Sequence, residues 1–152
     1  MTRYVASLAA TCAITIACGS TGEPLDGTDV GIAFQTHALQ CDIVDLKARL
    51  QIDAATCPLD VDAATHVVTG LCRKVPTGNL VNFRLVYFVL LGGRDVCLAT
   101  AIKQLDLTNE TREEITLQFS TRDLMTSIDF DADGATNIDE VCNGRNPLVQ
   151  DH

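Results

Sequence analysis

Apolar and polar residues alternate with a period of two through much of the segment 33–119. The apolar positions of the stretch 46–53 are separated by Lys47, Arg49, Gln51 and Asp53. This period is that of a β-strand with one buried face and one solvated face. Residues 81–90 begin with the same alternation and then become apolar throughout, which is typical of a central strand that is covered on both sides.

Further strands are expected at 96–105 and around residues 115–119, with turn signals at 76–79 and 92–95. Six or seven short strands at this spacing favour a mainly β fold, and we expect an antiparallel β-sandwich over residues 33–119. No helical pattern alternates with the strands, which disfavours a parallel α/β sheet.

The last part of the chain, residues 120–152, is expected to hold a short helix and a metal-binding loop. Ser120 and Asp123 have the spacing of a capping box, which predicts a short helix carrying Leu124, Met125 and Ile128.

The N-terminus has the pattern of a secretion signal. An apolar run from Val5 to Ala17, broken only by Ser and Thr, follows Arg3. The run is too short for a stable membrane span and fits a signal peptide over residues 1–17. The next segment, 18–32, is rich in Gly and acidic residues, so we expect a flexible tether.

The sequence Thr15-Ile16-Ala17-Cys18 resembles the lipobox of bacterial lipoproteins, with Thr15 where that family usually carries Leu. The resemblance implies cleavage before Cys18 and lipidation of its sulfur. The expected location is therefore extracytoplasmic, on the outer membrane or cell surface, with a membrane partner through the lipid. The alternative is plain secretion without lipidation.

Seven cysteines in this chain favour an oxidising compartment. A hairpin of residues 57–62 and 67–72 would place Cys57 opposite Cys72, Leu59 opposite Gly70 and Val61 opposite Val68. Directly opposed residues lie within disulfide reach, so Cys57 and Cys72 are disulfide candidates.

The remaining pairing stays open at the level of the sequence. Of Cys41, Cys97 and Cys142, one is expected to keep its thiol or to pair between molecules. No Cys-x-x-Cys spacing is present, which disfavours a zinc site.

Residues 129–140 match the calcium-loop pattern D-x-D-x-D-G-x5-E at every required position. Ca²⁺ binds six to eight oxygens at about 2.3–2.6 Å, and carboxylates at alternate positions can converge on it if the chain turns sharply at Gly134. The expected metal ligands are Asp129, Asp131, Asp133, Ala135, Asn137 and Glu140.

Each position of this loop has a distinct expected role. Ala135 would offer its backbone carbonyl, and Asn137 occupies the ninth position, where a water often intervenes. Glu140 would bind with both carboxylate oxygens, and Ile138 would pack the loop against the domain. The cofactor we expect is therefore Ca²⁺.

The segment 129–147 resembles the calcium loops of bacterial thrombospondin type 3-like and dockerin-like proteins, which are EF-hand-like. Gly144 and Pro147 are expected to end the second helix after about one turn, which is too short for a paired sensor EF-hand. The resemblance implies a structural, extracytoplasmic loop, and this chain carries one copy.

The net charge of the chain limits the classes of partner that it can bind. Lys and Arg total 11 and Asp and Glu total 20, for a formal net charge of −9. Such a surface repels phosphate backbones, so we expect no nucleic-acid partner.

No G-x-S-x-G motif or triad-like spacing is present, which favours a non-enzymatic calcium-binding structural or interaction module. Its partner would be a cell-envelope protein or polysaccharide. The alternative is a β-sandwich module that binds a carbohydrate or another small ligand.

Overall fold

The computed structural model describes residues 27–35, 39, 41–62, 64–76, 80–110, 112 and 114–150. The predicted signal peptide, the lipidation site Cys18 and the tether residues before Gly27 lie outside this part of the chain.

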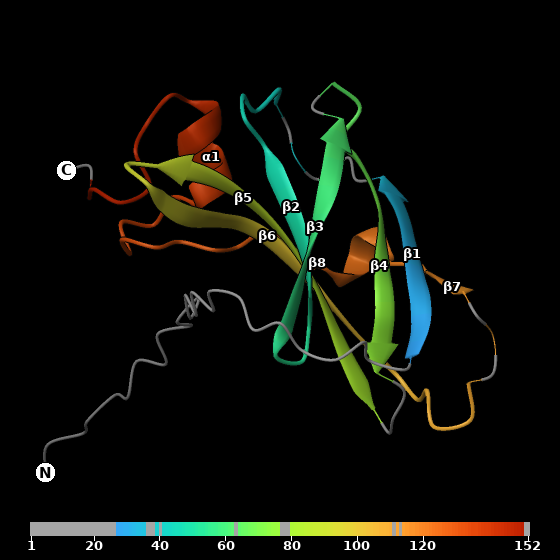
Figure 1. Cartoon of the computed structure of the whole chain (residues 1–152). Helices are drawn as coiled ribbons and strands as arrows, with labels where there is room; N and C mark the ends of the chain where they lie inside the picture. Colours follow the sequence, from blue (N-terminus) through green and yellow to red (C-terminus); the bar gives the residue numbers. More distant parts are fainter. Residues whose placement is uncertain are drawn as a thin grey trace, which may run out of the picture.

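The described residues form eight β-strands and one α-helix, which confirms a mainly β fold (Figure 1). The strands are β1 (Gly27–Gln35), β2 (Lys47–Ile52), β3 (Ala55–Asp62), β4 (Val67–Pro76), β5 (Val81–Leu91), β6 (Arg94–Leu105), β7 (Glu114–Leu117) and β8 (Leu124–Met125). The strands expected at 46–53, 81–90 and 96–105 are found as β2, β5 and β6.

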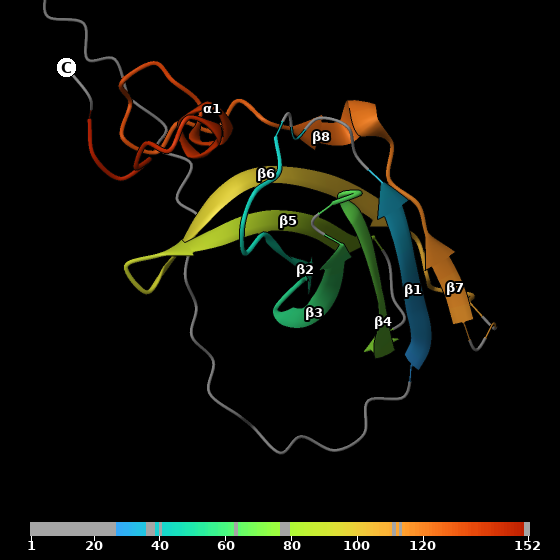
Figure 2. The ribbon, with the colours of Figure 1, turned by 90° about the horizontal axis from the view of Figure 1, so that it is seen from above.

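The described strands belong to a single sheet in the order β7-β1-β4-β3-β2-β5-β6-β8, which curls around its core (Figure 2). The separate second sheet of the predicted sandwich is not present in this part of the chain. The physical reason is β3, because Ala55–Leu59 pairs with β2 while Asp60–Asp62 pairs with β4. The prediction of an antiparallel sheet holds except at one edge, where β7 runs parallel to β1.

The first strand corrects the predicted boundary between tether and domain. Residues 27–32, which the sequence predicts to be part of the tether, belong to β1. Along β1, Val30, Ile32 and Phe34 are buried at alternate positions. This period of two outweighs the Gly-rich and acidic composition that suggested a tether.

The core lies inside the curl of the sheet. Phe83, Leu85 and Tyr87 of β5 face it and are fully buried. On the opposite face of the same sheet, Val86, Phe88 and Cys97 form a second cluster, against which Ile128 packs. The continuous apolar run in β5 therefore reflects coverage by the C-terminal segment.

The C-terminal segment confirms the predicted capping box and corrects the helix. Ser120 caps a single 3₁₀ turn, η1 (Thr121–Asp123), in which Asp123 accepts a hydrogen bond from the Ser120 N–H. The chain then becomes extended, and Leu124 and Met125 pair with Ala101 and Thr100 of β6. The unpaired backbone edge of β6 thus draws the segment into the sheet instead of a longer helix.

The α-helix α1 (Asn137–Cys142) follows the acidic loop and ends at Asn143 and Gly144, as the sequence predicted. Gly144 has φ +70°, the left-handed conformation common just after a helix C-terminus. No described helix is long and apolar enough to cross a membrane.

Two disulfides join described cysteines. The predicted pair Cys57–Cys72 is confirmed, with its Cα atoms 5.8 Å apart. The second disulfide, Cys41–Cys142, ties the loop before β2 to the end of α1. Cys97 is the cysteine of this group that keeps its thiol, and it is buried.

Candidate metal centre

The loop between β8 and α1 brings three acidic side chains together. Asp129, Asp131 and Asp133 each place a carboxylate oxygen so that all these oxygens lie within 4.8 Å of one another. The side chains are half-buried, which keeps part of the cluster away from water. Oxygens of this kind at this spacing are the donors that a hard divalent cation requires.

Backbone N–H groups of the loop hold the carboxylates in place. Asp129 accepts hydrogen bonds from the N–H of Ala132 at 2.7 Å and of Gly134 at 3.0 Å. Asp131 and Asp133 each accept one from the residue two positions later, at 3.2 Å and 2.8 Å. The local backbone therefore orients the three side chains toward one point.

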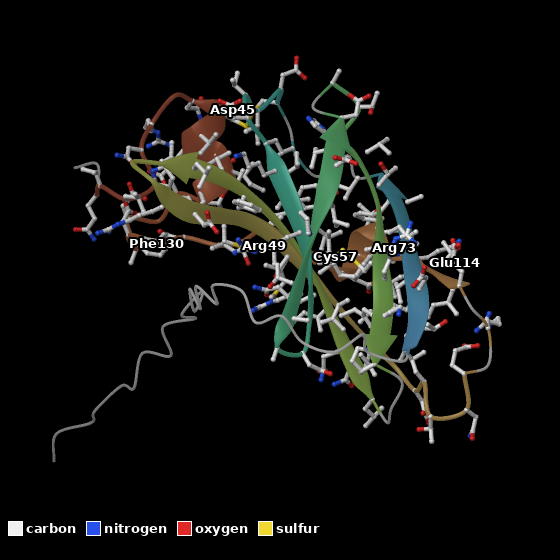
Figure 3. All side chains as sticks on the ribbon, in the orientation of Figure 1. Asp45, Arg49, Cys57, Arg73, Glu114 and Phe130 are labelled. Atoms are coloured by element: carbon white, nitrogen blue, oxygen red, sulfur yellow. A yellow bond between two sulfur atoms is a disulfide. The ribbon has the colours of Figure 1, made fainter. Side chains whose placement is uncertain are left out.

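Two residues with positive φ make the tight turn possible. Gly134 has φ +97°, a conformation that side chains with a Cβ rarely adopt, and this matches the role expected of that glycine. Ala132 has φ +62°. Phe130, between the first two aspartates, is largely exposed and lies on the outside of the loop (Figure 3).

One oxygen of the cluster lacks a protein partner. Asp131 Oδ2 is shielded from solvent and accepts no hydrogen bond from the described residues. A shielded carboxylate oxygen without a donor is costly unless a cation or another donor satisfies it. The cluster therefore offers three carboxylate oxygens close together, and Asp131 adds one shielded oxygen that the described residues leave without a donor.

Glu140 lies on α1 and its side chain is fully buried. It is not one of the residues whose oxygens lie within 4.8 Å of each other. The N–H of Glu140 donates to the Thr136 carbonyl at 3.0 Å, which fixes the residue on the first turn of α1. Ile138, expected to pack the loop against the domain, is buried in the main core.

The side chain of Asn137, another expected ligand, forms hydrogen bonds with two backbone groups. Its Oδ1 accepts a hydrogen bond from the Phe130 N–H at 2.9 Å, and its Nδ2 donates to the Cys97 carbonyl at 2.7 Å. Its own N–H donates to the Ile128 carbonyl at 2.7 Å. Asn137 therefore anchors the loop to β6.

The predicted ligand residue Ala135 lies next to the cluster, and its N–H donates to Asp133. The sequence did not point to Gln150, whose Nε2 donates to the Asp131 carbonyl at 2.7 Å and ties the C-terminal tail to the loop. Nothing in the spacing of Gln150 from the motif signals this contact.

No family model, curated protein or solved structure matches this chain.

Proposed function

We propose that this protein is an extracytoplasmic, membrane-anchored lipoprotein that binds one Ca²⁺ and acts as a non-enzymatic structural or interaction module. The observation that carries the proposal is the convergence of Asp129, Asp131 and Asp133, with Asp131 Oδ2 shielded from solvent and without a donor. The match of residues 129–140 to an EF-hand-like motif supports the same metal.

The ligand arrangement we propose begins from this cluster. The three aspartates supply carboxylate oxygens, and the Ala135 carbonyl completes the loop side. Glu140 closes the shell from α1. Its side chain is buried on the first turn of the helix that follows the loop, and it is the remaining carboxylate of the motif.

The compartment is supported by the disulfides. Structural disulfides persist in oxidising environments and are rare in a reducing cytosol. The pairs Cys41–Cys142 and Cys57–Cys72 therefore favour a location outside the cytoplasm, as the lipobox-like sequence at Cys18 does.

The metal is tested by thermal unfolding in EDTA and in Ca²⁺, with Asp131→Asn beside the matched control Asp42→Asn. Asp42 is exposed and outside the loop. We expect Ca²⁺ to raise the melting temperature of the wild type and of the Asp42 variant. Asp131→Asn should lose the increase and, in EDTA, be at least as stable as the wild type, since one source of carboxylate repulsion is gone. A wild type that does not respond to Ca²⁺ would overturn the proposal.

The anchor is tested separately. Cys18→Ser removes the sulfur that lipidation requires, so the protein should leave the membrane fraction and appear in the soluble fraction. Cys12→Ser, a cysteine in the predicted signal peptide, is the matched control and should still sediment with membranes. A Cys18→Ser variant that stays with the membrane would contradict lipidation at this residue.

A further inference from the structure

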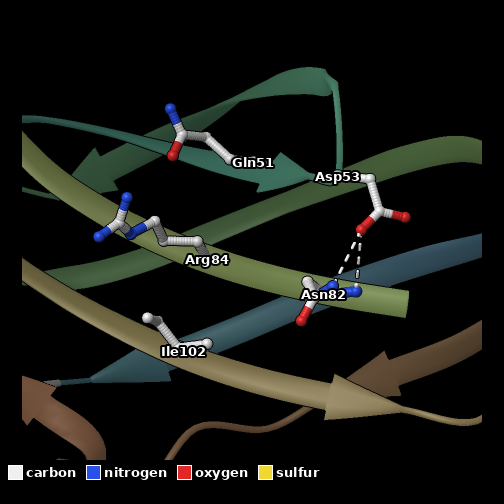
Figure 4. Close-up of a pocket in the computed structure, with 5 residues that line it drawn as sticks. All are labelled: Gln51, Asp53, Asn82, Arg84 and Ile102. Atoms are coloured by element: carbon white, nitrogen blue, oxygen red, sulfur yellow. Dashed lines mark hydrogen bonds between the residues drawn. The ribbon is translucent and has the colours of Figure 1, made fainter. Parts of the chain in front are cut away.

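A shallow depression of about 430 Å³ lies on the solvent face of the sheet, apart from the metal loop. Figure 4 shows the side chains that line it, which come from β2, β5, β6 and the turn after β2. They are Gln51, Asp53, Asn82, Arg84 and Ile102. The strand register places Gln51, Arg84 and Ile102 in one row across the sheet.

One end of the depression is a fixed carboxylate. Asp53 Oδ1 accepts hydrogen bonds from the Asn82 N–H at 3.3 Å and from Asn82 Nδ2 at 3.2 Å (Figure 4). Asn82 Oδ1 in turn accepts from Gln104 Nε2 at 2.7 Å. The chain of amides orients Asp53, and its second oxygen remains available to accept from a ligand.

The other end is a guanidinium with an amide beside it. The side chains of Arg84 and Gln51 extend to the same end, away from the Asp53 carboxylate (Figure 4). Arg84 Nε is shielded from solvent and makes no hydrogen bond, and no described carboxylate forms an ion pair with Arg84. Buried donors nearly always have a hydrogen-bond partner, so the unpaired Nε–H of Arg84 is unusual and favours a role for this guanidinium in binding.

The separation of the two ends restricts the ligand. Asn82, which holds Asp53, and Arg84 are two positions apart on β5, so their backbone positions are about 6.8 Å apart at the usual rise per residue. Because the side chains of Arg84 and Gln51 extend away from the Asp53 carboxylate, the two ends are further apart than the backbone positions (Figure 4). A free amino acid carries its ammonium and carboxylate on one carbon and cannot reach both ends. A disaccharide is longer, and its hydroxyl groups each donate and accept. Ile102, half-exposed at the edge, offers an apolar surface to the C–H face of a ring.

We propose that this depression binds a neutral disaccharide unit of a polysaccharide, with a hydroxyl donating to Asp53 and others accepting from Arg84 and Gln51. Opposite charges at the two ends and the net charge of −9 disfavour acidic sugars. Because no aromatic side chain lines the depression, the affinity is expected to be in the millimolar range. The site is independent of the calcium loop.

The test is a ¹⁵N–¹H NMR titration of the oxidised protein in EDTA with cellobiose, maltose and N,N′-diacetylchitobiose in turn. We expect at least one of these probes to cause saturable shifts in the side-chain amides of Gln51 and Asn82 and in the Nε–H of Arg84. No saturable shift with any of the three, or shifts confined to other residues, would overturn the proposal.

Arg84→Gln and Gln51→Ala should each weaken binding at least tenfold. Arg122→Gln, which removes an exposed arginine on η1, is the matched control and should bind as the wild type does. Melting temperatures establish that the variants are folded.

L-glutamate is the competing probe. If it shifts the Arg84 Nε–H as strongly as the disaccharides do, Arg84 is an anion contact and the saccharide site is rejected. Since the titration is done without Ca²⁺, failure of the metal proposal does not change its outcome.

Discussion

At the scale of single residues, Tyr87 is the most unusual member of the core. It is fully buried on β5, and its hydroxyl has no hydrogen-bond partner among the described residues. Burial raises the pKa of the Tyr87 phenol well above its ordinary value. An unsatisfied hydroxyl in an apolar core costs about 1–3 kcal/mol of desolvation, so the ring stabilises the fold while its oxygen opposes it.

Tyr87→Phe should therefore raise the free energy of unfolding by about 1 kcal/mol at neutral pH, measured by urea denaturation. Because the raised pKa makes the folded state hold the phenol proton more tightly than the unfolded state, the wild type should lose stability as the pH rises above about 10. The advantage of the variant should grow in that range. A Phe variant less stable than the wild type would show that the hydroxyl has a favourable partner.

Asn137 shows how one amide can anchor a loop. Asn137→Ala removes the hydrogen bonds to Phe130 and Cys97 and leaves both backbone groups without partners. We expect a loss of roughly 2–4 kcal/mol in unfolding free energy, in EDTA as well as in Ca²⁺. Asn143→Ala, which removes an exposed amide bound to the Asp139 carbonyl, is the control and should cost less than 1 kcal/mol, since water replaces that contact. If Asn137→Ala were destabilising only in Ca²⁺, Asn137 would be a metal ligand and not an anchor.

At the scale of elements, the β3–β4 hairpin is a part of the fold whose residue pairing the local sequence predicts closely. Val61 pairs with Val68, as the sequence predicted, and the side chain of Leu59 fills the space that Gly70 leaves. A Cβ added at Gly70 would lie 2.6 Å from Leu59 Cδ2. The hairpin therefore depends on a large residue and a glycine at opposed positions.

Gly70→Ala should lower the unfolding free energy by about 1 kcal/mol or less, because the atom that the new methyl group meets is the end of the Leu59 side chain, which can shift. In a Leu59→Ala background the same substitution should cost much less, because the obstructing methyl group is gone. The coupling is measured by a double-mutant cycle in urea. Additive effects of the two substitutions would rule out a direct contact.

Patterns within one element were sufficient to predict most strands, the hairpin disulfide and the capping box. What they missed depends on contacts between distant segments. The helix predicted from Ser120 ends after a single turn because the next residues pair with the open edge of β6. The start of β1 is hidden in the sequence because its Gly-rich and acidic composition is also that of a tether. For the acidic loop 129–140, spacing predicted that Asp129, Asp131 and Asp133 would converge, and the structure brings these three together. The spacing does not predict the contact of the Asn137 amide, because the Cys97 carbonyl that accepts its hydrogen bond is 40 residues away in the sequence.

At the scale of the whole molecule, the disulfides act over very different distances along the chain. Cys57–Cys72 closes a sequence separation of 15 residues, whereas Cys41–Cys142 closes one of 101. In the chain-entropy model, loops of these lengths contribute about 3 and 4.7 kcal/mol. The longer one also holds α1, which carries Glu140, against the loop before β2.

The double variant Cys41→Ser/Cys142→Ser should thus be less stable than Cys57→Ser/Cys72→Ser, as measured by chemical denaturation. It should also bind Ca²⁺ more weakly by calorimetry, because α1 loses its covalent tether. The hairpin variant should keep the Ca²⁺ affinity of the wild type and serves as the control. Equal Ca²⁺ affinities in both variants would show that the tether on α1 does not prepare the metal site.

The curled sheet ends in very short strands, with four residues in β7 and two in β8. Sheet edges with long rows of unpaired N–H and C=O groups pair with strands of neighbouring molecules, which leads to aggregation. On the β6 side, β8 pairs with Thr100 and Ala101 and the Asn137 amide occupies the Cys97 carbonyl, so these backbone groups are closed to such additions. Copies crowded at high local concentration would therefore find the middle of this edge already occupied.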